Sequence, residues 1–414
     1  MSRTLTNEEK RVVYYAQNNK PTDPKLVNNE TPLDSLNLNW REKDLPERER
    51  TKHVHRLHPY LGKYIPQLVE IFLRKYFKPK QTVLDPFCGS GTTLVQANEL
   101  NIHSIGYDIS KFNVLLSQVK TAEYDVDLLD KEVKDSIEKL RGLIGKLSNE
   151  LQFEEIKELD PSLHTNTDTD NEYLKTWFAP QALKELLLYH NLIETQSYKY
   201  ADVMKIILSR SARSARQTTH FDLDFPKKPV TNEYWCYKHS RMCRPTKEAY
   251  KFIRRYSVDT LRRIKEYSML RTKADVKVFN EDSRTASFPA FDGIITSPPY
   301  VGLIDYHEQH AYGYHLLNLE DQREKEIGPA SNGANGNARL KYQEDITTVF
   351  KNAANSVKPG SRFIVIAGDR HNLYDSIAEG AGLEVESIIQ RHVNRRTGRR
   401  STEFYESIFV WRKP

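Results

Sequence analysis

The sequence predicts an α/β fold in which one mostly parallel, doubly wound sheet is split by a mainly helical insertion. Three observations lead to this prediction. Short strand-like runs alternate with helical patterns up to about residue 125, and this alternation resumes near residue 276. A Gly-rich turn follows the first strand-like run, and an acidic residue ends the second, as in half of a doubly wound sheet. The stretch between the two parts shows only helical periodicity.

The first alternating part follows a polar segment, residues 1–52, which has no clear period and which we expect to form a loosely packed arm. Apolar residues at helical spacing then predict a helix within Leu57–Phe77. The elements expected next are a strand at 81–84, a helix at 92–100 and a strand at 104–107.

The central part predicts three amphipathic helices. They cover about residues 128–147, a Leu-rich stretch that opens at Pro180, and residues 246–267. The acidic, polar residues 148–172 between the first two predict a loop.

The second alternating part begins near Val276. A helix is expected at 344–357, where Pro359-Gly360 stops it, and the Gly- and Asn-containing residues 320–341 predict a mobile loop. The strands are expected at 276–279, 294–296, 363–366, 385–389 and 407–411, the last two as a terminal hairpin. We therefore divide the chain into an arm, a first half-domain, a helical insertion and a second half-domain, at 1–52, 53–125, 126–275 and 276–414.

The composition indicates a globular protein, with 38% apolar and 29% charged residues in 414. No run approaches the ~18 apolar residues of a membrane span, and the polar N-terminus lacks the apolar core of a signal peptide. Three cysteines are too few for a disulfide framework. We expect a cytoplasmic protein without a membrane partner.

Charge is distributed unevenly along the chain. Residues 122–204 carry 9 Lys/Arg against 18 Asp/Glu, whereas residues 205–273 carry 18 against 6. Residues 390–413 form a second basic block, with 7 Lys/Arg against 2 Asp/Glu. Two separate basic blocks favour a polyanion as partner, although ordinary solvated surfaces would give the same counts.

The first chemical motif is the turn Asp85-Pro86-Phe87-Cys88-Gly89-Ser90-Gly91-Thr92, directly after a strand. Small residues there let the backbone approach a ligand, and the following helix offers free amides. Asp108 ends the next strand, where an acid can bind ribose hydroxyls. A plain tight turn is the alternative. A phosphate loop or a dinucleotide fold is disfavoured, because the Gly-Lys-Ser/Thr ending and the third Gly are absent.

The second motif is Ser297-Pro298-Pro299-Tyr300, after the strand at 294–296. Two prolines fix a rigid loop with an outward carbonyl, Ser297 adds a hydroxyl and Tyr300 a flat ring. Such a loop can accept hydrogen bonds from an exocyclic amino group and stack on its ring. Alone, the run would also fit a simple proline turn.

Together the two motifs resemble those of the amino-methylating DNA methyltransferases, which use S-adenosylmethionine. In that family an Asp-Pro-Phe-x-Gly-Ser-Gly-Thr loop binds the cofactor and a Ser/Asn/Asp-Pro-Pro-Tyr loop holds the flipped base. The Ser form is typical of cytosine-N4 enzymes, and the Asn and Asp forms of adenine-N6 enzymes. The order of cofactor half, insertion and catalytic half resembles the alpha-type arrangement. The resemblance covers about residues 53–125 and 276–414.

This resemblance implies a Rossmann-like methyltransferase sheet, mostly parallel with a terminal antiparallel hairpin, and a role for particular residues. The catalytic residues implied are Ser297, Pro298, Pro299 and Tyr300. The cofactor-binding residues implied are Tyr60, Lys63, Asp85, Pro86, Phe87, Gly89, Ser90, Gly91, Thr92, Asp108, Ile109, Asp282 and Ser283. In this interpretation the insertion is the target-recognition region.

The basic residues are then expected to bind double-stranded DNA. Arg210, Arg213 and Arg216 would form a loose helical stripe suited to phosphates. The other expected contacts are Lys227, Lys228, Arg241, Arg395, Arg396 and Arg399.

The cysteines predict neither covalent catalysis nor a metal site. None follows a proline, as the nucleophile of cytosine-C5 enzymes does. Cys236, His239 and Cys243 could be metal ligands, but their spacing is not a standard zinc pattern and the sequence shows no evident fourth ligand. We therefore expect packed thiols and no metal.

The function predicted is methylation of cytosine N4 in duplex DNA, in a prokaryotic, nucleoid-associated restriction–modification enzyme with a possible cognate endonuclease. The alternatives are adenine-N6 methylation of DNA, guanine-N2 methylation of RNA, and a catalytically silent DNA-binding protein.

Overall fold

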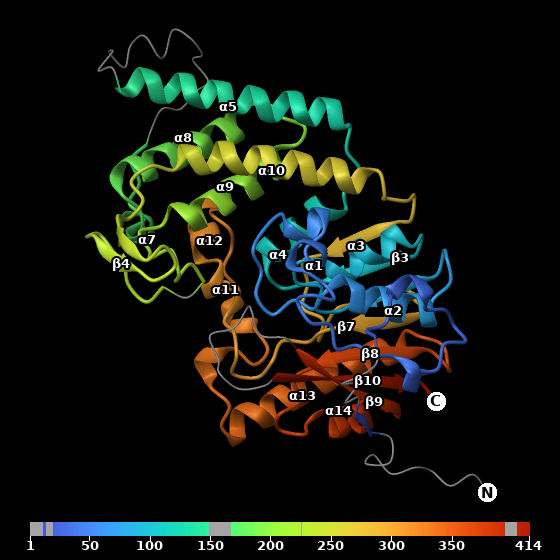
Figure 1. The fold of residues 1–414 in the computed structure, drawn as a ribbon. Coiled ribbons are helices and arrows are strands. Elements are labelled where there is room, and N and C mark those ends of the chain that lie inside the picture. Colours follow the sequence, from blue (N-terminus) through green and yellow to red (C-terminus); the bar gives the residue numbers. More distant parts are fainter. Residues whose placement is uncertain (1–10, 14–19, 149–166, 225, 394–403) are drawn as a thin grey trace, which may run out of the picture.

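The computed structural model describes residues 11–13, 20–148, 167–224, 226–393 and 404–414. Its centre is an eight-stranded sheet with the strand order β1-β9-β10-β8-β7-β2-β3-β6 (Figure 1). Only β10 runs against its neighbours, β8 and β9, while the other neighbouring strands are parallel. The strands are β1 (Arg11–Val13), β2 (Thr82–Asp85), β3 (His103–Tyr107), β6 (Val276–Phe279), β7 (Gly293–Thr296), β8 (Arg362–Ala367), β9 (Glu384–Val393) and β10 (Phe404–Arg412).

Helices cover both faces of this sheet, so its central strands are buried on both sides and consist almost wholly of apolar residues. On one face α2 (Pro66–Tyr76) packs through Phe72 against the side chains of β7 and β8. On the other face α13 (Gly336–Asn355) and α14 (Tyr374–Gly380) pack around Phe350 and Trp411.

The direction of chain progression reverses between β2 and β7, which lie side by side. From β2 the chain passes through α3 (Thr92–Glu99) to β3 on one side, whereas from β7 it passes to β8 on the other. In open α/β sheets such a reversal leaves a crevice at the carboxyl ends of the two strands. Both sequence motifs follow these two ends.

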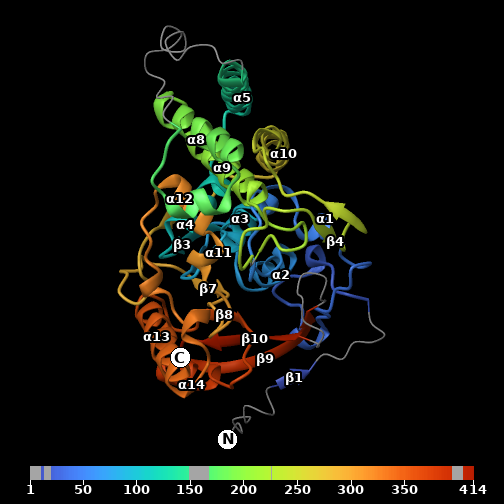
Figure 2. The same ribbon diagram turned by 90° about the vertical axis from the view of Figure 1, so that its left-hand side faces the viewer.

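The insertion consists of α5 (Val126–Ser148), α7 (Glu172–Trp177), α8 (Pro180–Thr195), α9 (Ala201–Ala215) and α10 (Tyr250–Ser268). Their apolar faces form one core with α4 (Lys111–Thr121) and α12 (Ala311–Leu317), so the insertion is continuous with the sheet domain (Figures 1 and 2). A short hairpin, β4 (Tyr234–Cys236) and β5 (Arg241–Cys243), lies at the edge of the molecule in both views.

The predicted strands of both halves and the terminal hairpin are confirmed, but two sequence predictions are wrong. The described part of the N-terminal segment, residues 11–13 and 20–52, is not loosely packed: β1 pairs with β9, and Leu36 and Leu38 are each only 1% exposed. The loop predicted at 320–341 becomes helical at Gly336, because the Asn335 side chain accepts a hydrogen bond from the Ala338 amide and begins α13. Most of the acidic loop predicted at 148–172 lies outside the described residues.

In the part of the chain that the structure describes, no helix is both long and apolar enough to cross a membrane.

Candidate active site

Asp85 joins the two motif loops at the centre of the sheet. Its buried carboxylate accepts hydrogen bonds from Thr296 Oγ1 at 2.6 Å, Thr93 Oγ1 at 2.6 Å, Tyr64 OH at 3.1 Å and the Phe87 amide at 3.2 Å. Burial raises the pKa of Asp85, although these donors oppose the shift. Because Thr296 immediately precedes the second motif, the carboxylate fixes the distance between the two loops. Asp85 is not among the residues that line the pocket beside these loops, and its predicted contact with the cofactor stays a prediction.

The Gly-rich turn depends on the absence of side chains at two positions. Gly89 has φ +48°, and a Cβ there would lie 2.9 Å from the hydroxyl of Tyr60. Gly91 has φ +74°, and a Cβ there would lie 2.8 Å from Ser117 Oγ. L-residues rarely adopt such φ values, so both glycines are required by conformation as well as by space. Gly91 is not among the residues that line the pocket, and its predicted contact with the cofactor stays a prediction.

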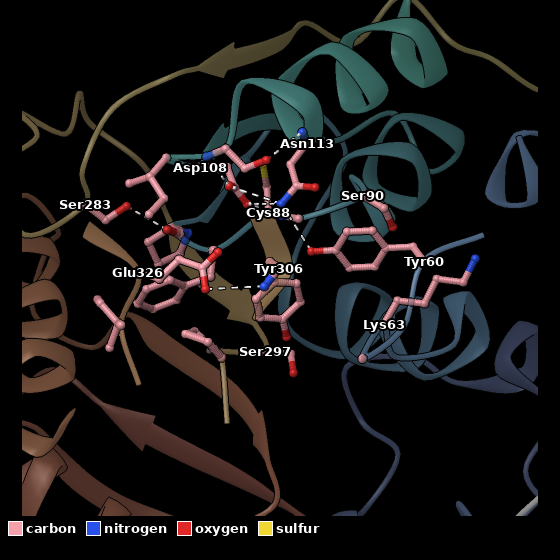
Figure 3. A pocket seen from close by; sticks show the side chains of 18 of the residues that line it. Tyr60, Lys63, Cys88, Ser90, Asp108, Asn113, Ser283, Ser297, Tyr306 and Glu326 are labelled. Carbon is pink, nitrogen blue, oxygen red and sulfur yellow. Dashed lines mark hydrogen bonds between the residues drawn. The ribbon is translucent and has the colours of Figure 1, made fainter. Parts of the chain in front are cut away.

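A pocket of about 830 Å³, including its open mouth, lies where the two motif loops meet (Figure 3). Eleven of the thirteen predicted cofactor-binding residues line it: Tyr60, Lys63, Pro86, Phe87, Gly89, Ser90, Thr92, Asp108, Ile109, Asp282 and Ser283. Ser297 and Pro299 of the second motif line the same pocket.

Asp108, at the end of β3, is the buried acid of this pocket. Its carboxylate accepts hydrogen bonds from the Gly89 amide at 2.9 Å, the Ser110 amide at 2.8 Å and Asn113 Nδ2 at 3.2 Å (Figure 3). Burial raises the pKa of Asp108 to about 6, and these donors limit the rise. The carboxylate is thus held in one orientation, with a pKa close to neutral pH.

The turn after β6 forms another wall of the pocket. Asp282 is half-buried and forms an ion pair with Arg284 at 2.6 Å. Burial alone would raise the pKa of Asp282, but the hydrogen bonds and charge of Arg284 lower it overall. Ser283 Oγ donates to the Pro86 carbonyl at 2.6 Å, which attaches this turn to the first motif. The exposed Glu281 also lines the pocket and is a second acid at this wall.

In the second motif, the residues differ in their access to the pocket. Ser297 and Pro299 line it, whereas Pro298 is buried and Tyr300 is not among the lining residues. The Tyr300 hydroxyl donates to Glu406 Oε1 at 3.2 Å, and burial raises the pKa of Tyr300. The partly buried ring packs against the core that contains α13, and the stacking role of Tyr300 stays a prediction.

The segment after the second motif forms a third wall of the pocket, which neither motif predicts. His307 is 1% exposed, and its Nδ1 contacts the carboxylate of Glu326, which also accepts a hydrogen bond from the His307 amide at 2.8 Å. Tyr306 begins α11 (Tyr306–Gln309), and its ring stacks with that of Tyr60, their centroids 5.8 Å apart. Glu326 falls in the segment that was predicted to be a mobile loop, and only its buried pairing with His307 identifies it as part of the site.

The arginine stripe predicted on α9 is not a surface. Arg210 is 8% exposed and forms an ion pair with Asp259 at 2.7 Å. Arg216 is 4% exposed and lies over the ring of Tyr312, 4.5 Å from its centroid. Arg213 is paired with Asp224. Arg210 thus joins α9 to α10 and Arg216 joins it to α12, whereas Arg213 pairs with the loop that follows α9. In this structure the three guanidinium groups are engaged within the protein.

Of the other six predicted DNA contacts, the structure describes three. Lys227, Lys228 and Arg241 are exposed, near or on the β4–β5 hairpin. Arg395, Arg396 and Arg399 lie outside the described residues.

Comparisons with known proteins agree with this geometry. The model of a family described as DNA methylase matches residues 4–118. The chain is 38% identical, over 88% of its length and 81% of the relative, to "Type II methyltransferase M.MjaII" of Methanocaldococcus jannaschii. The chain belongs to the amino-methylating DNA methyltransferases. This methyltransferase is also 25% identical, over 68% of its length and 56% of the relative, to "Type II methyltransferase M.BsoBI" of Geobacillus stearothermophilus.

Among solved structures, a SAM-dependent methyltransferase of Methanosarcina mazei matches 83% of this chain and 96% of its own, with 8% identity and a TM-score of 0.32.

The cofactor of the family is S-adenosylmethionine, and the pocket residues fit it. Gly89 and its neighbours leave backbone exposed where a side chain would block the space. Asp108 offers a fixed carboxylate to hydroxyl donors, and Phe87 and Ile109 add apolar walls. A nucleoside with a charged tail needs this combination of acid, backbone and apolar surface.

Proposed function

We propose that this DNA methyltransferase acts on the exocyclic N4 of a cytosine that has been flipped out of duplex DNA, as the modification enzyme of a restriction–modification system. The observation that carries the proposal is the position of Ser297. It lies at the carboxyl end of β7 and lines the same pocket as Asp108, whose carboxylate is held by the amide of the Gly-rich turn.

The amino group of cytosine is a poor nucleophile, because its lone pair is delocalised into the ring. Ser297 Oγ and the Pro298 carbonyl would each accept a hydrogen bond from one of its two protons. Such acceptors favour the pyramidal nitrogen of the transition state over the planar ground state. S-adenosylmethionine supplies a methyl group activated by a sulfonium, so no covalent enzyme intermediate is needed. The chain contributes orientation, since both loops are fixed to Asp85.

Three further assignments belong to this proposal. Asp108 would accept hydrogen bonds from the ribose hydroxyls of the cofactor, and Asp282 or Glu281 would face its adenine. Base flipping is inferred because a stacked base cannot enter a pocket bounded by Tyr306 and Ser297, and it costs a few kcal/mol. The region 126–275 would contribute target recognition through the exposed residues of the β4–β5 hairpin, with Lys227, Lys228 and Arg241 as DNA contacts.

The test is incubation of the protein with labelled S-adenosylmethionine and plasmid DNA, followed by digestion to nucleosides and mass spectrometry. N4-methylcytosine is the expected product. N6-methyladenine instead would keep the enzyme class and overturn the base assignment. Label in structured RNA but not in DNA would transfer the function to RNA. A protein that binds DNA but neither S-adenosylmethionine nor label would be a silent DNA-binding protein.

A further inference from the structure

The β4–β5 hairpin holds a cluster of four side chains that the active site does not use. His220 lies in the loop after α9, Cys236 ends β4, His239 is in the hairpin turn and Cys243 ends β5. One nitrogen or sulfur atom of each lies within 4.8 Å of the corresponding atoms of the other three. None of the four lines the methyltransferase pocket. Their spacing in the chain, fifteen residues and then two and three, gives little hint of a common site, because His220 is remote from the hairpin in sequence.

The distances within this cluster are those of ligands around one tetrahedral ion. Cys236 Sγ is 3.7 Å from His220 Nδ1 and 3.5 Å from His239 Nδ1, and Cys243 Sγ is 3.5 Å from His239 Nδ1. With Zn–S near 2.3 Å and Zn–N near 2.0 Å, tetrahedral angles place sulfur and nitrogen ligands roughly 3.6 Å apart. The two imidazole rings meet edge to face at 64°, so they approach a common point from different directions.

The local structure orients these side chains, and the hydrogen-bond contacts of their thiols and ring nitrogens within the described residues are those among themselves. The His220 amide donates to Tyr234 OH at 3.0 Å, which fixes the loop against β4. The His239 amide donates to the Cys236 carbonyl at 3.1 Å, and Ser240 has φ +49°, which closes the turn. Thiols and imidazoles form only weak hydrogen bonds with each other, so such contacts alone would stabilise the hairpin little.

Among the described residues, none from the hairpin belongs to one of the three apolar clusters, and its apolar contacts include those of Phe221 with Tyr234 and Tyr237. Each strand has three residues, and Trp235, Tyr237 and Met242 are 50%, 77% and 54% exposed. Isolated two-stranded hairpins are marginally stable in water. A bound ion would supply the missing stabilisation, as it does in small domains whose cores are too small.

We propose that His220, Cys236, His239 and Cys243 bind a structural Zn²⁺ ion that fixes the hairpin. Two thiolates and two neutral imidazoles in tetrahedral array favour zinc among the common divalent metals. Binding releases the two thiol protons to solvent, and the two thiolates then neutralise the ion. Four protein ligands leave no open position, which makes the site structural. Since the exposed Lys238 and Arg241 lie on the same hairpin, the ion would hold a basic and aromatic surface in one shape.

A second cluster, His53, His55 and Glu99, is a weaker candidate. The Lys52 ammonium lies 2.7 Å from the Glu99 carboxylate and already supplies the positive charge there. Only three ligands converge, so we assign no ion to it.

The inference does not depend on the proposed base specificity, and its test needs no methylation assay. Zinc is measured by mass spectrometry of the dialysed full-length protein, with circular dichroism as a check of folding. The wild type should hold about one zinc per chain, as a closed four-ligand site would. Cys236→Ser and Cys243→Ser should lose it. Cys88→Ser is the matched control for zinc content and should keep it, because Cys88 is buried at the Gly-rich turn.

Two further measurements cover the case in which the cysteine variants fail to fold. His239 is exposed, so His239→Ala should remain folded yet bind zinc at least about tenfold more weakly in competition with a chelator, as for a lost ligand. Replacement of zinc by Co²⁺ should give thiolate charge-transfer absorption, which Cys236→Ser abolishes. Zinc-free protein that takes up neither metal, zinc content unchanged in the Cys236→Ser/Cys243→Ser double variant, or a Cys236–Cys243 disulfide in the purified protein would each overturn the proposal.

Discussion

The pocket and the β4–β5 hairpin hold their polar groups in opposite ways. At the pocket, the chain itself satisfies the buried carboxylates: Asp85 has four hydrogen-bond donors, and Asp108 has donors from the Gly-rich turn and α4. At the hairpin, Cys236 and Cys243 contact the ring nitrogens of His220 and His239 at 3.5–3.7 Å. The first region is held by hydrogen bonds within the chain, whereas the second would be held by the ion that we propose. Changes in the two regions should therefore have separable consequences.

The largest effect is expected on stability at Asp85. Asp85→Ala removes the acceptor of the Thr296 hydroxyl and of the Phe87 amide, whereas Thr93 keeps the Ile295 carbonyl and Tyr64 keeps its contact with Thr93. Unsatisfied buried groups cost about 1–3 kcal/mol each, so the loss of these two bonds should lower the free energy of unfolding by about 2–6 kcal/mol. Chemical denaturation measures the loss.

Asp85→Asn is the matched control for this change, because it keeps one acceptor oxygen and should lose less. Equal losses for the two variants would mean that the carboxylate does not join the loops as described. Zinc content should be unchanged in any folded fraction of either variant, because the hairpin lies elsewhere.

The next effect is expected on catalysis at Ser297. Ser297→Ala removes one acceptor for the target amino group, and loss of one such transition-state hydrogen bond costs on the order of 10²-fold in rate. Single-turnover methylation measures it. The affinity for S-adenosylmethionine should change little, because Asp108 and the Gly-rich turn remain. The control is Ser361→Ala, the same substitution directly before the amino end of β8, at the end of the sheet opposite the pocket. A variant at position 297 with normal single-turnover rates would exclude Ser297 from the reaction.

A smaller, pH-dependent effect is expected at Asp108. Ribose hydroxyls would donate to the ionised carboxylate, whose pKa is raised to about 6. Below that pH the carboxylate becomes protonated, so the affinity for S-adenosylmethionine should fall as the pH drops through 6, by up to about tenfold per pH unit. Asp108→Asn should bind more weakly and show no such dependence. Calorimetric titration at pH 5, 6 and 7.5 measures both, and a wild-type affinity that is constant across this range would remove the ribose assignment.

The same carboxylate should affect stability with the opposite sign. Its folded-state pKa of about 6 lies above the ordinary value of 3.8, so the folded protein holds the proton more tightly. The contribution of Asp108 to the free energy of unfolding is therefore present below pH 3.8 and is lost as the pH rises through 6. Asp108→Asn should flatten that part of the wild-type stability profile.

The contrast between the two regions also explains what could be predicted from the sequence. The pocket is built from contiguous motifs at strand ends, and these identified most of its lining residues together with the strands that carry them. Glu326 and His307 were missed because their pairing is tertiary: nineteen residues separate them, and neither lies in a recognised pattern. Asp85 was placed in the motif, but only the structure shows that Tyr64 and Thr296 occupy its oxygens.

The cluster of possible metal ligands at the hairpin was also hard to predict, because it too depends on a tertiary contact. Three of the four side chains were recognised as possible ligands, and the set was dismissed because its spacing is not a standard zinc pattern and no fourth ligand was evident. His220 supplies it from a loop sixteen residues earlier, which periodicity does not reveal. The charge count likewise detected a basic block but could not separate exposed Lys227 from buried Arg210, because burial depends on how α9 packs.

The smallest effect is expected on DNA binding when single exposed charges are removed. It tests whether the exposed basic residues, unlike the buried arginines of α9, contact DNA. Lys227→Gln, Lys228→Gln and Arg241→Gln should each reduce the log–log salt slope of DNA binding by about 0.9 if the side chain contacts a phosphate. This equals roughly a threefold change in affinity between 50 and 200 mM salt for each contact. Lys358 is exposed and precedes the amino end of β8, at the end of the sheet opposite the pocket. Lys358→Gln should therefore leave the slope unchanged. S-adenosylmethionine affinity should be the same in all four variants. Parental slopes at the three hairpin-side positions would make this surface an ordinary solvated face, while a reduced slope in Lys358→Gln would show that DNA contacts the opposite end of the sheet.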